Sequence, residues 1–289
     1  MNDYIKLIKP RISLLVLLTG YLGYYLGLRD QGLYSDYQTL MFLLIGMFFS
    51  ASGCAVLNQY LEKDFDAQMN RTKNRPIPSG RISPINALIF GSILSVFGVF
   101  FIYVTVNLLT TIICFLTVFL YLFVYTPSKR FSTFNTIIGS FPGALPVLGG
   151  WTAATDNLNS ISWILFSILF CWQIPHFLAI AIIYAKDYKK GGFKMLPSEY
   201  PNSKHTQYHV LFFSIAMVGT SLALYFNSKN IVDFGYFLGI SIIGILFLIV
   251  VLQFLFNSSN RNAKKLMRAT LFYFPLMFIL IILDAMGII

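Results

Sequence analysis

Residues 38–66 read QTLMFLLIGMFFSASGCAVLNQYLEKDFD, a long apolar run that ends in three carboxylates. The run 38–61 is long enough to cross the hydrocarbon core of a bilayer as an α-helix, which needs about 20 apolar residues. Glu62, Asp64 and Asp66 follow it directly, in a chain with eleven acidic residues. An ionisable group at bilayer depth costs roughly 2.5–3.5 kcal/mol, so this cluster indicates a binding or catalytic role.

Similar apolar runs recur along the whole chain. Of its 289 residues, 57% are hydrophobic and 11% are charged, and the mean hydropathy is +0.71. This composition predicts an all-α polytopic membrane protein with a single transmembrane domain over residues 1–289, because the runs are continuous and do not alternate as in a β-barrel. We predict nine spans, at residues 11–29, 38–61, 84–106, 108–126, 135–155, 160–185, 208–227, 231–256 and 264–289.

The placement of the cations argues for a membrane surface and against nucleic acid as the partner of this basic chain, whose net charge is +10. Of its 21 lysines and arginines, all except Arg29 and Lys229 fall in the N-terminal segment or in the connections after even-numbered spans. The positive-inside rule therefore predicts a cytoplasmic N-terminus and a C-terminus outside the cell. The two longest acidic connections, about 58–83 and 186–207, then share the cytoplasmic side.

Asn58, Glu62 and Asp66 are spaced four residues apart, which predicts that one helix face carries all three. Two carboxylates about 6 Å apart repel by roughly 3 kcal/mol at an effective dielectric of 20. A bound Mg²⁺ would remove that repulsion, and carboxylate and amide oxygens are ligands that it prefers. Asp64 lies off this face and is expected to pair with Lys63 or Arg71. The alternative is a solvated helix end with local ion pairs.

A second polar segment follows span six, where Asp187 stands among Lys186, Lys189, Lys190 and Lys194. By itself this segment is typical of a positive-inside loop. Together, the two segments supply carboxylates for metal ions and cations for phosphates. That combination suits a diphosphate held through Mg²⁺ and ionised by stabilisation of the leaving group.

Two further features lie inside the spans. Pro142 and Pro146 in span five predict either a broken helix that lines a cavity or an ordinary kinked helix with close-packing glycines. His176 precedes Asp187 by close to three helical turns, so it should point the same way from deeper in the membrane. A lone intramembrane histidine is more often an interhelical hydrogen bonder, and the alternative is a polar contact or haem ligand beside a substrate.

Several motifs together resemble the UbiA-type intramembrane prenyltransferases over nearly the whole chain, and within that superfamily its haem-farnesylating branch. The residues that carry this resemblance are Lys9–Ile12, Asn58 to Asp66, Asp66–Arg75, Asn135–Gly139, Pro142–Pro146, Pro175–Phe177 and Asp187–Pro197. The resemblance implies a nine-helix bundle with a central cavity that opens near the cytoplasmic side. It also implies Mg²⁺-dependent transfer of a farnesyl group from farnesyl diphosphate to a vinyl group of haem b, giving haem O for terminal oxidase assembly.

Carried over by position, the resemblance assigns roles to particular residues. Asn58, Glu62, Asp66 and Asp187 are the expected metal ligands, and the three acids among them are the expected catalytic residues. His176, from its alignment with Asp187 and not from the resemblance, is the expected haem contact. The expected diphosphate ligands are Arg71, Lys129, Lys190, Lys194, Arg11 and Arg75.

The sequence departs from the superfamily pattern at two positions. Glu62 stands where Asp is commoner, and its longer arm changes the reach of the carboxylate. Gly191 stands where many members carry a second acid after the position of Asp187, so the second metal would have fewer protein ligands.

Other functions remain open at this point. A UbiA-type enzyme that prenylates an aromatic quinone precursor is the nearest alternative, and a membrane transporter with intramembrane acids is an alternative from another class. The expected surroundings are the lipid bilayer of a bacterial cytoplasmic membrane, and haem A-pathway or oxidase-assembly proteins are possible partners.

Overall fold

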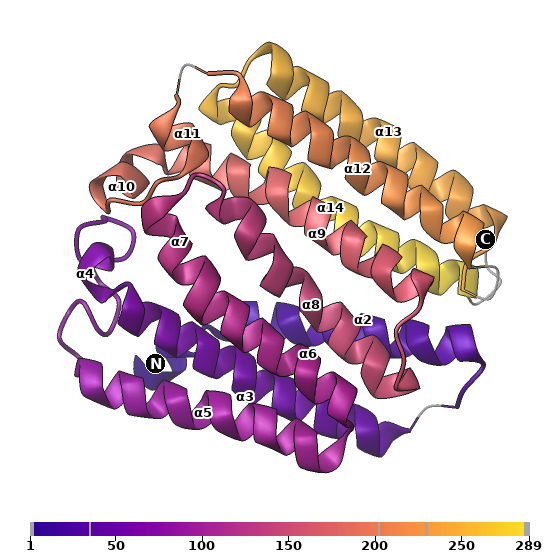
Figure 1. The fold of residues 1–289 in the computed structure, drawn as a ribbon. Coiled ribbons are helices and arrows are strands. Elements are labelled where there is room, and N and C mark those ends of the chain that lie inside the picture. The colour runs from indigo at the N-terminus through magenta and orange to yellow at the C-terminus, as the bar shows by residue number, and fades with distance from the viewer. Residues whose placement is uncertain (1–2, 35, 202, 229–230, 286–289) are drawn as a thin grey trace. The chain divides into compact units, whose positions relative to one another are not determined.

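The computed structural model describes residues 3–34, 36–201, 203–228 and 231–285, and every regular element in these ranges is helical. Lys229 and the last part of predicted span nine, residues 286–289, lie outside the described residues. The elements are shown in Figure 1. They are α1 (Asp3–Leu7), α2 (Pro10–Gln31), α3 (Tyr37–Leu61), α4 (Lys63–Asp66), α5 (Pro84–Thr105), α6 (Leu108–Phe119), η1 (Leu120–Tyr125), α7 (Thr126–Phe131), α8 (Asn135–Thr155), α9 (Ser160–Ile183), α10 (Ala185–Lys190), α11 (Leu196–Glu199), α12 (His205–Asn227), α13 (Phe234–Phe256) and α14 (Asn260–Ala285).

In the described part of the chain, nine helices are long and apolar enough to cross a membrane, and they lie where the nine spans were predicted. The largest difference is in span four, which was expected to end at residue 126 but continues as a helix to Phe131. This span joins α6 and α7 through the π-helical turn η1. The extension therefore places Lys129 and Arg130 on a helix instead of a loop.

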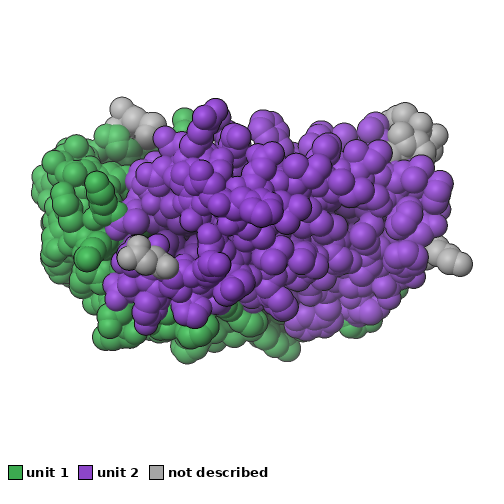
Figure 2. Space-filling model, turned by 90° about the horizontal axis from the view of Figure 1, so that it is seen from above, with its two compact units in different colours: residues 1–158, 186–194 green, residues 159–185, 195–289 purple. Residues whose placement is uncertain are grey.

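The chain divides into two compact units, coloured separately in Figure 2. Unit 1 contains residues 1–158 and 186–194, and unit 2 contains residues 159–185 and 195–289. The first predicted acidic segment and residues 186–194 of the second, including Asp187, thus belong to unit 1. Residues 195–207 of the second segment and His176 belong to unit 2. A single functional domain over 1–289 stays a prediction.

In unit 1, small residues let the helices pack closely. A Cβ on Gly53 of α3 would lie 2.2 Å from the hydroxyl of Ser95 on α5, and one on Gly150 of α8 would lie 1.8 Å from the carbonyl oxygen of Gly20 on α2. Lipid tails are as apolar as Leu, so membrane helices associate through such close van der Waals contact. Two tight pairs, α3 with α5 and α2 with α8, result.

The helix containing Pro142 and Pro146 is unbroken, since α8 runs from Asn135 to Thr155 through both prolines. The broken helix predicted as one interpretation of span five is therefore wrong, and the close contact of Gly150 with Gly20 agrees with the close-packing glycines of the other interpretation. Polar caps start several of the spans, because the first backbone N–H groups of a helix have no partner inside it. Asp36 accepts from Gln38 N at the start of α3, and Asn107 from Thr110 N at the start of α6.

In unit 2, a carboxylate near one helix end caps the start of another helix. Asp284 of α14 is 5% exposed and accepts hydrogen bonds from the backbone N–H groups of Asp233 and Tyr236, at 2.5 and 3.1 Å. These donors lie at the first turn of α13. The presence of Asp284 inside a predicted span thus has a structural explanation. Its carboxylate satisfies N–H groups at the start of α13 and is stabilised by the positive end of that helix dipole.

Candidate functional site

Asn58, Glu62 and Asp66 are all buried in unit 1, with 2%, 5% and 1% of their surfaces exposed. Their common burial agrees with the predicted shared face, since Leu61 and Asp64 between them are exposed, although Gln59 is buried as well. The expected continuous helix is wrong, however, because α3 ends at Leu61 and α4 begins at Lys63. Glu62 forms the joint with φ −100° and ψ 5°, yet the hydrogen bonds Glu62 N to Asn58 O and Asp66 N to Glu62 O, at 3.0 and 2.8 Å, preserve the spacing.

Each acid of this group is matched by a cation. Lys129 Nζ lies 2.7 Å from Glu62 Oε1, and Arg75 Nη1 lies 2.5 Å from Asp66 Oδ2. These pairs offset the cost of burying two carboxylates, which is high for any that are unpaired. The exposed Asp64 instead pairs with Lys63 at 3.4 Å, as one of its two predicted partners.

Asn58 is held by two side chains from distant parts of the chain. Its Nδ2 donates to Thr126 Oγ1 at 3.2 Å, and Lys9 Nζ donates to its Oδ1 at 3.4 Å. Lys9 has φ 48° and ψ 66°, a left-handed conformation that non-glycine residues rarely adopt. Burial and, next, the charge of Arg75 lower the pKa of Lys9 to about 7. The N-terminal segment thus contributes an amino group to this site.

Asp66 offers the clearest test of whether a divalent cation fits this group. Its Oδ1 is buried and has no hydrogen-bond partner among the described residues. Burial raises the pKa of its carboxyl, although the charge of Arg75 lowers it. A buried carboxylate oxygen without a partner is costly, and Asn58 and Glu62 are further buried residues with oxygens of the kind that a hard cation prefers. The donor set therefore fits Mg²⁺.

The two acidic segments lie side by side within unit 1 (Figure 1). Arg71 Nη2 donates to the Tyr188 hydroxyl at 3.2 Å and lies over its ring, and the rings of Phe65 and Phe193 are 5.6 Å apart. A Cβ at Gly191 would lie 2.9 Å from Met69 Cγ. A side chain at this position would therefore require the flexible side chain of Met69 to move aside.

The remaining predicted site residues are more exposed than Asn58, Glu62 and Asp66. Asp187 is partly buried, whereas Lys190, Lys194 and Arg11 are exposed. Within the described ranges, no three or more His, Cys, Asp or Glu side chains are grouped so that they could hold a metal ion. The metal and diphosphate roles of these residues stay predictions.

Three residues near the acids were given no site role from the sequence. They are Lys9, Tyr125 and Arg130, which contact Asn58, Lys129 and the Leu61–Phe65 joint, respectively. Lys9, and not Arg11, reaches Asn58, and Lys129 Nζ lies over the Tyr125 ring at 4.5 Å. The sequence carries a weak signal for Tyr125, because it precedes Lys129 by one helical turn and so shares its face.

His176 in unit 2 hydrogen-bonds between helices. Its Nδ1 lies 2.9 Å from Thr270 Oγ1, and its ring stacks on Trp172, which donates from Nε1 to the carbonyl oxygen of Thr270 at 2.6 Å. The interhelical role weighed from the sequence is therefore observed. Haem binding by His176 stays a prediction.

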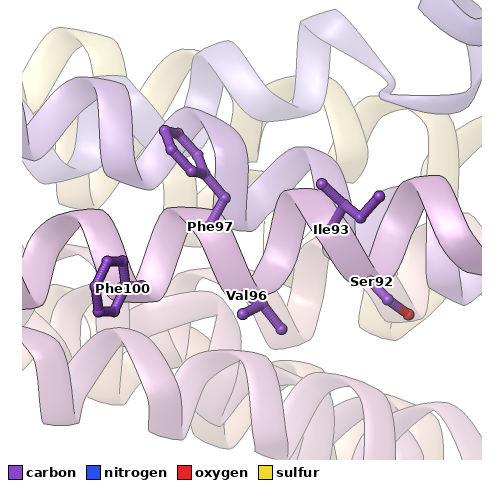
Figure 3. Close-up of a pocket in the computed structure, with 5 residues that line it drawn as sticks. All are labelled: Ser92, Ile93, Val96, Phe97 and Phe100. Carbon is purple, nitrogen blue, oxygen red and sulfur yellow. The ribbon is translucent and has the colours of Figure 1, made fainter.

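A hollow on the surface of α5 is separate from these residues. Figure 3 shows its lining, which is apolar apart from one hydroxyl and comes from a single helix. The lining residues are Ser92, Ile93, Val96, Phe97 and Phe100. None of them is a predicted site residue.

The fold and this site together define an all-helical, multi-pass membrane protein with a buried group of acids and cations at one end of its spans. The profile of the UbiA prenyltransferase family matches residues 16–282. The chain belongs to the UbiA prenyltransferase family and is a membrane prenyltransferase.

Relatives of known name match over essentially full length. The chain is 38% identical to the protoheme IX farnesyltransferase of Solibacter usitatus, covering 100% of both sequences. It is also 38% identical to the protoheme IX farnesyltransferase of Salinibacter ruber, covering 98% of both. The resemblance inferred from the motifs is thereby confirmed.

Solved structures support the fold. A digeranylgeranylglyceryl phosphate synthase matches with a TM-score of 0.82 at 21% identity, covering 99% of this chain and 98% of that one. A UbiA homologue from Archaeoglobus fulgidus bound to DMAPP and Mg²⁺ matches with a TM-score of 0.67 at 16% identity, covering 97% and 99%. At these identities the likeness shows the UbiA fold.

Proposed function

We propose that this chain is a protoheme IX farnesyltransferase, which transfers the farnesyl group of farnesyl diphosphate to a vinyl group of haem b and so makes haem O. The observation that carries the proposal is the buried pair Glu62 and Asp66, each matched by a cation, in a chain whose full-length relatives are protoheme IX farnesyltransferases. In the reaction, the C1–O bond of the farnesyl diphosphate breaks and a C–C bond forms to the vinyl carbon. Water supplies the hydroxyl group of the product, and its remaining proton leaves to the solvent or the diphosphate.

The acids of unit 1 would hold Mg²⁺. Asn58, Glu62 and Asp66 supply buried oxygens, and Asp187 comes from the adjoining segment. When bound, Mg²⁺ would neutralise the diphosphate and stabilise it as a leaving group. The Mg²⁺ in the Archaeoglobus fulgidus homologue supports this assignment.

The cations of the same unit would bind the diphosphate oxygens. Lys129 and Arg75 already lie at the acids, at 2.7 and 2.5 Å, so each is positioned beside the expected metal ligands. The Tyr188 hydroxyl and ring hold Arg71 from the second segment. Lys190 and Lys194 are exposed and would meet the diphosphate from the aqueous side, with Arg11 as a more distant candidate.

The orientation of the chain follows from its charges. The N-terminus and both acidic segments would face the cytoplasm of a bacterial cell, and the C-terminus would lie outside. Labelling of Ser203→Cys by a membrane-impermeant thiol reagent tests this. The reagent should react from the cytoplasmic side alone, in a background without the three native cysteines.

The decisive experiment uses the purified protein in lipid nanodiscs with haem b, farnesyl diphosphate and Mg²⁺, followed by mass analysis. A haem carrying one hydroxyethylfarnesyl arm is expected, and chelation of Mg²⁺ should prevent its formation. Prenylation of 4-hydroxybenzoate in place of haem would support the quinone-precursor alternative. Failure to release diphosphate with any acceptor would favour a transporter.

A further inference from the structure

Arg130 contacts both sides of the joint that carries the two buried acids. Its Nη2 donates to the carbonyl oxygen of Leu61 at 2.7 Å, and its guanidinium lies 4.1 Å from the centroid of the Phe65 ring. Leu61 is the last residue of α3, and Phe65 lies in α4. One side chain therefore joins the two helices across Glu62.

Both contacts are of kinds that fix local geometry. The last carbonyl groups of a helix have no partner inside it, and a cationic donor there is favoured by charge and by the helix dipole. A guanidinium over an aromatic face adds an attraction that depends on the plane of the ring. Arg130 thus constrains the end of α3 and the orientation of α4 together.

The neighbouring Lys129 acts on the same joint in a different way. Lys129 touches the carboxylate of Glu62, whereas Arg130 touches the backbone and a ring. The extension of span four to Phe131 brings both cations to the joint from one helix. Lys129 therefore contacts an acid directly, whereas the next residue, Arg130, contacts the helix ends on either side of that acid.

We propose that Arg130 is a positioning residue for the metal and diphosphate site, a proposal that rests on the function proposed above. It holds the α3–α4 joint so that Glu62 and Asp66 both turn inward, at 5% and 1% exposed, while Asp64 turns outward. Successive residues of a helix point in directions about 100° apart. A rotation of α4 by one such step would therefore turn Asp66 away from the interior.

The test is Mn²⁺ affinity of the purified full chain with inorganic pyrophosphate present, measured by electron paramagnetic resonance of the free Mn²⁺. Arg130→Met should weaken Mn²⁺ binding about tenfold, the equivalent of one charge-assisted hydrogen bond. The Mn²⁺ affinity of Arg130→Lys should fall between those of the wild type and Arg130→Met. Lysine can donate to the carbonyl oxygen of Leu61 but lacks the planar group that covers the Phe65 ring.

Arg81→Met is the matched control. Arg81 also donates to a backbone carbonyl, that of Asn74 at 2.8 Å, and belongs to the first acidic segment, but it contacts neither side of the joint. Arg81→Met should leave Mn²⁺ affinity unchanged, even though its effect on Tm is expected to be similar to that of Arg130→Met.

Wild-type Mn²⁺ affinity in Arg130→Met, or an equal loss in Arg81→Met, would overturn the proposal. If Arg130→Met does not fold, full affinity in Arg130→Lys would overturn it, and an intermediate affinity would support it. A wild-type protein that binds no Mn²⁺ with pyrophosphate would overturn the metal assignment of the proposed function as well.

Discussion

At the scale of single residues, burial separates three acids that stand close together in the sequence. Glu62 and Asp66 are buried and ion-paired across the fold, whereas the Asp64 side chain is 78% exposed and pairs with its neighbour Lys63. Exposed pairs contribute little, but a buried carboxylate must be compensated. We therefore expect Glu62 and Asp66 to take part in metal binding and catalysis, and we expect no such role for Asp64.

This difference gives a matched pair of variants. Asp66→Asn should lower turnover of farnesyl diphosphate at least about 100-fold, because it removes a negative charge that would hold the metal ion, which in turn stabilises the diphosphate leaving group. Asp64→Asn should stay within about twofold, since its pair is exposed. Initial rates of diphosphate release, with Tm as a folding check, measure both. Near-normal turnover in Asp66→Asn would refute its metal role.

At the scale of elements, two features set how the helices of unit 1 begin and pack. Asp36 caps the first turn of α3, with its carboxylate accepting from Gln38 N and Thr39 Oγ1 at 3.0 and 2.6 Å. Farther along, α2 and α8 meet through glycines that leave no space for a side chain. The stability that the Asp36 cap provides should depend on pH. The stability of the contact between α2 and α8 should depend on the size of the side chains at the glycine positions.

The cap predicts a dependence of stability on pH. The hydrogen bond from Thr39, above all, lowers the pKa of Asp36 below 3.8, so the folded state favours the charged carboxylate. Its contribution is therefore present above pH 3.8 and is lost as the pH falls through the lower folded value. Asp36→Ala should lower Tm at pH 7, and its difference from the wild type should shrink toward pH 3. A difference that stays constant over this range would contradict the assignment.

The glycine contact predicts a loss of stability. A Cβ on Gly150 would lie 1.8 Å from the backbone oxygen of Gly20, which cannot move aside as a flexible side chain could. Gly150→Ala should therefore destabilise the protein by about 1–3 kcal/mol, the usual cost of overpacking. Gly219→Ala on α12 is the control, because among the described residues nothing lies within 4 Å of its added Cβ. There alanine should be neutral or stabilise by up to about 1 kcal/mol in reversible unfolding in detergent. Equal effects of both substitutions would argue against the tight crossing.

At the scale of the whole molecule, the candidate groups fall in separate units. The acids and their cations belong to unit 1, and His176 with its partners Trp172 and Thr270 belongs to unit 2. Each group is held by contacts within its own unit. We therefore expect that variants in one unit can change the binding of one substrate without changing the other.

His176→Ala tests this expectation. It should weaken haem b binding severalfold in a spectroscopic titration, because a ring nitrogen or polar contact is lost. Pyrophosphate binding with Mg²⁺ should not change. Thr270→Val removes the hydrogen bond of His176 but keeps the imidazole, so it controls for a structural effect. Unchanged haem affinity in His176→Ala, or equal losses in both variants, would exclude a direct haem contact.

The sequence by itself determined the nine spans and predicted that Asn58, Glu62 and Asp66 share one helix face. Both are local properties, because backbone groups in lipid must be satisfied within their own helix and because four-residue spacing fixes a face. The sequence also pointed to two charged segments, but it could not show that Gly191 of the second segment packs against Met69 of the first.

Only the tertiary structure decided which basic residue meets Glu62 and which meets Asn58. Lys129 reaches Glu62 across 67 residues, and Lys9 reaches Asn58 across 49. Such pairings depend on how separate helices cross, which glycine contacts such as that of Gly150 with Gly20 set, and not on spacing along one helix. For the same reason the break at Glu62, and the role of Arg130 in holding it, became visible once α7 lay beside the joint of α3 and α4.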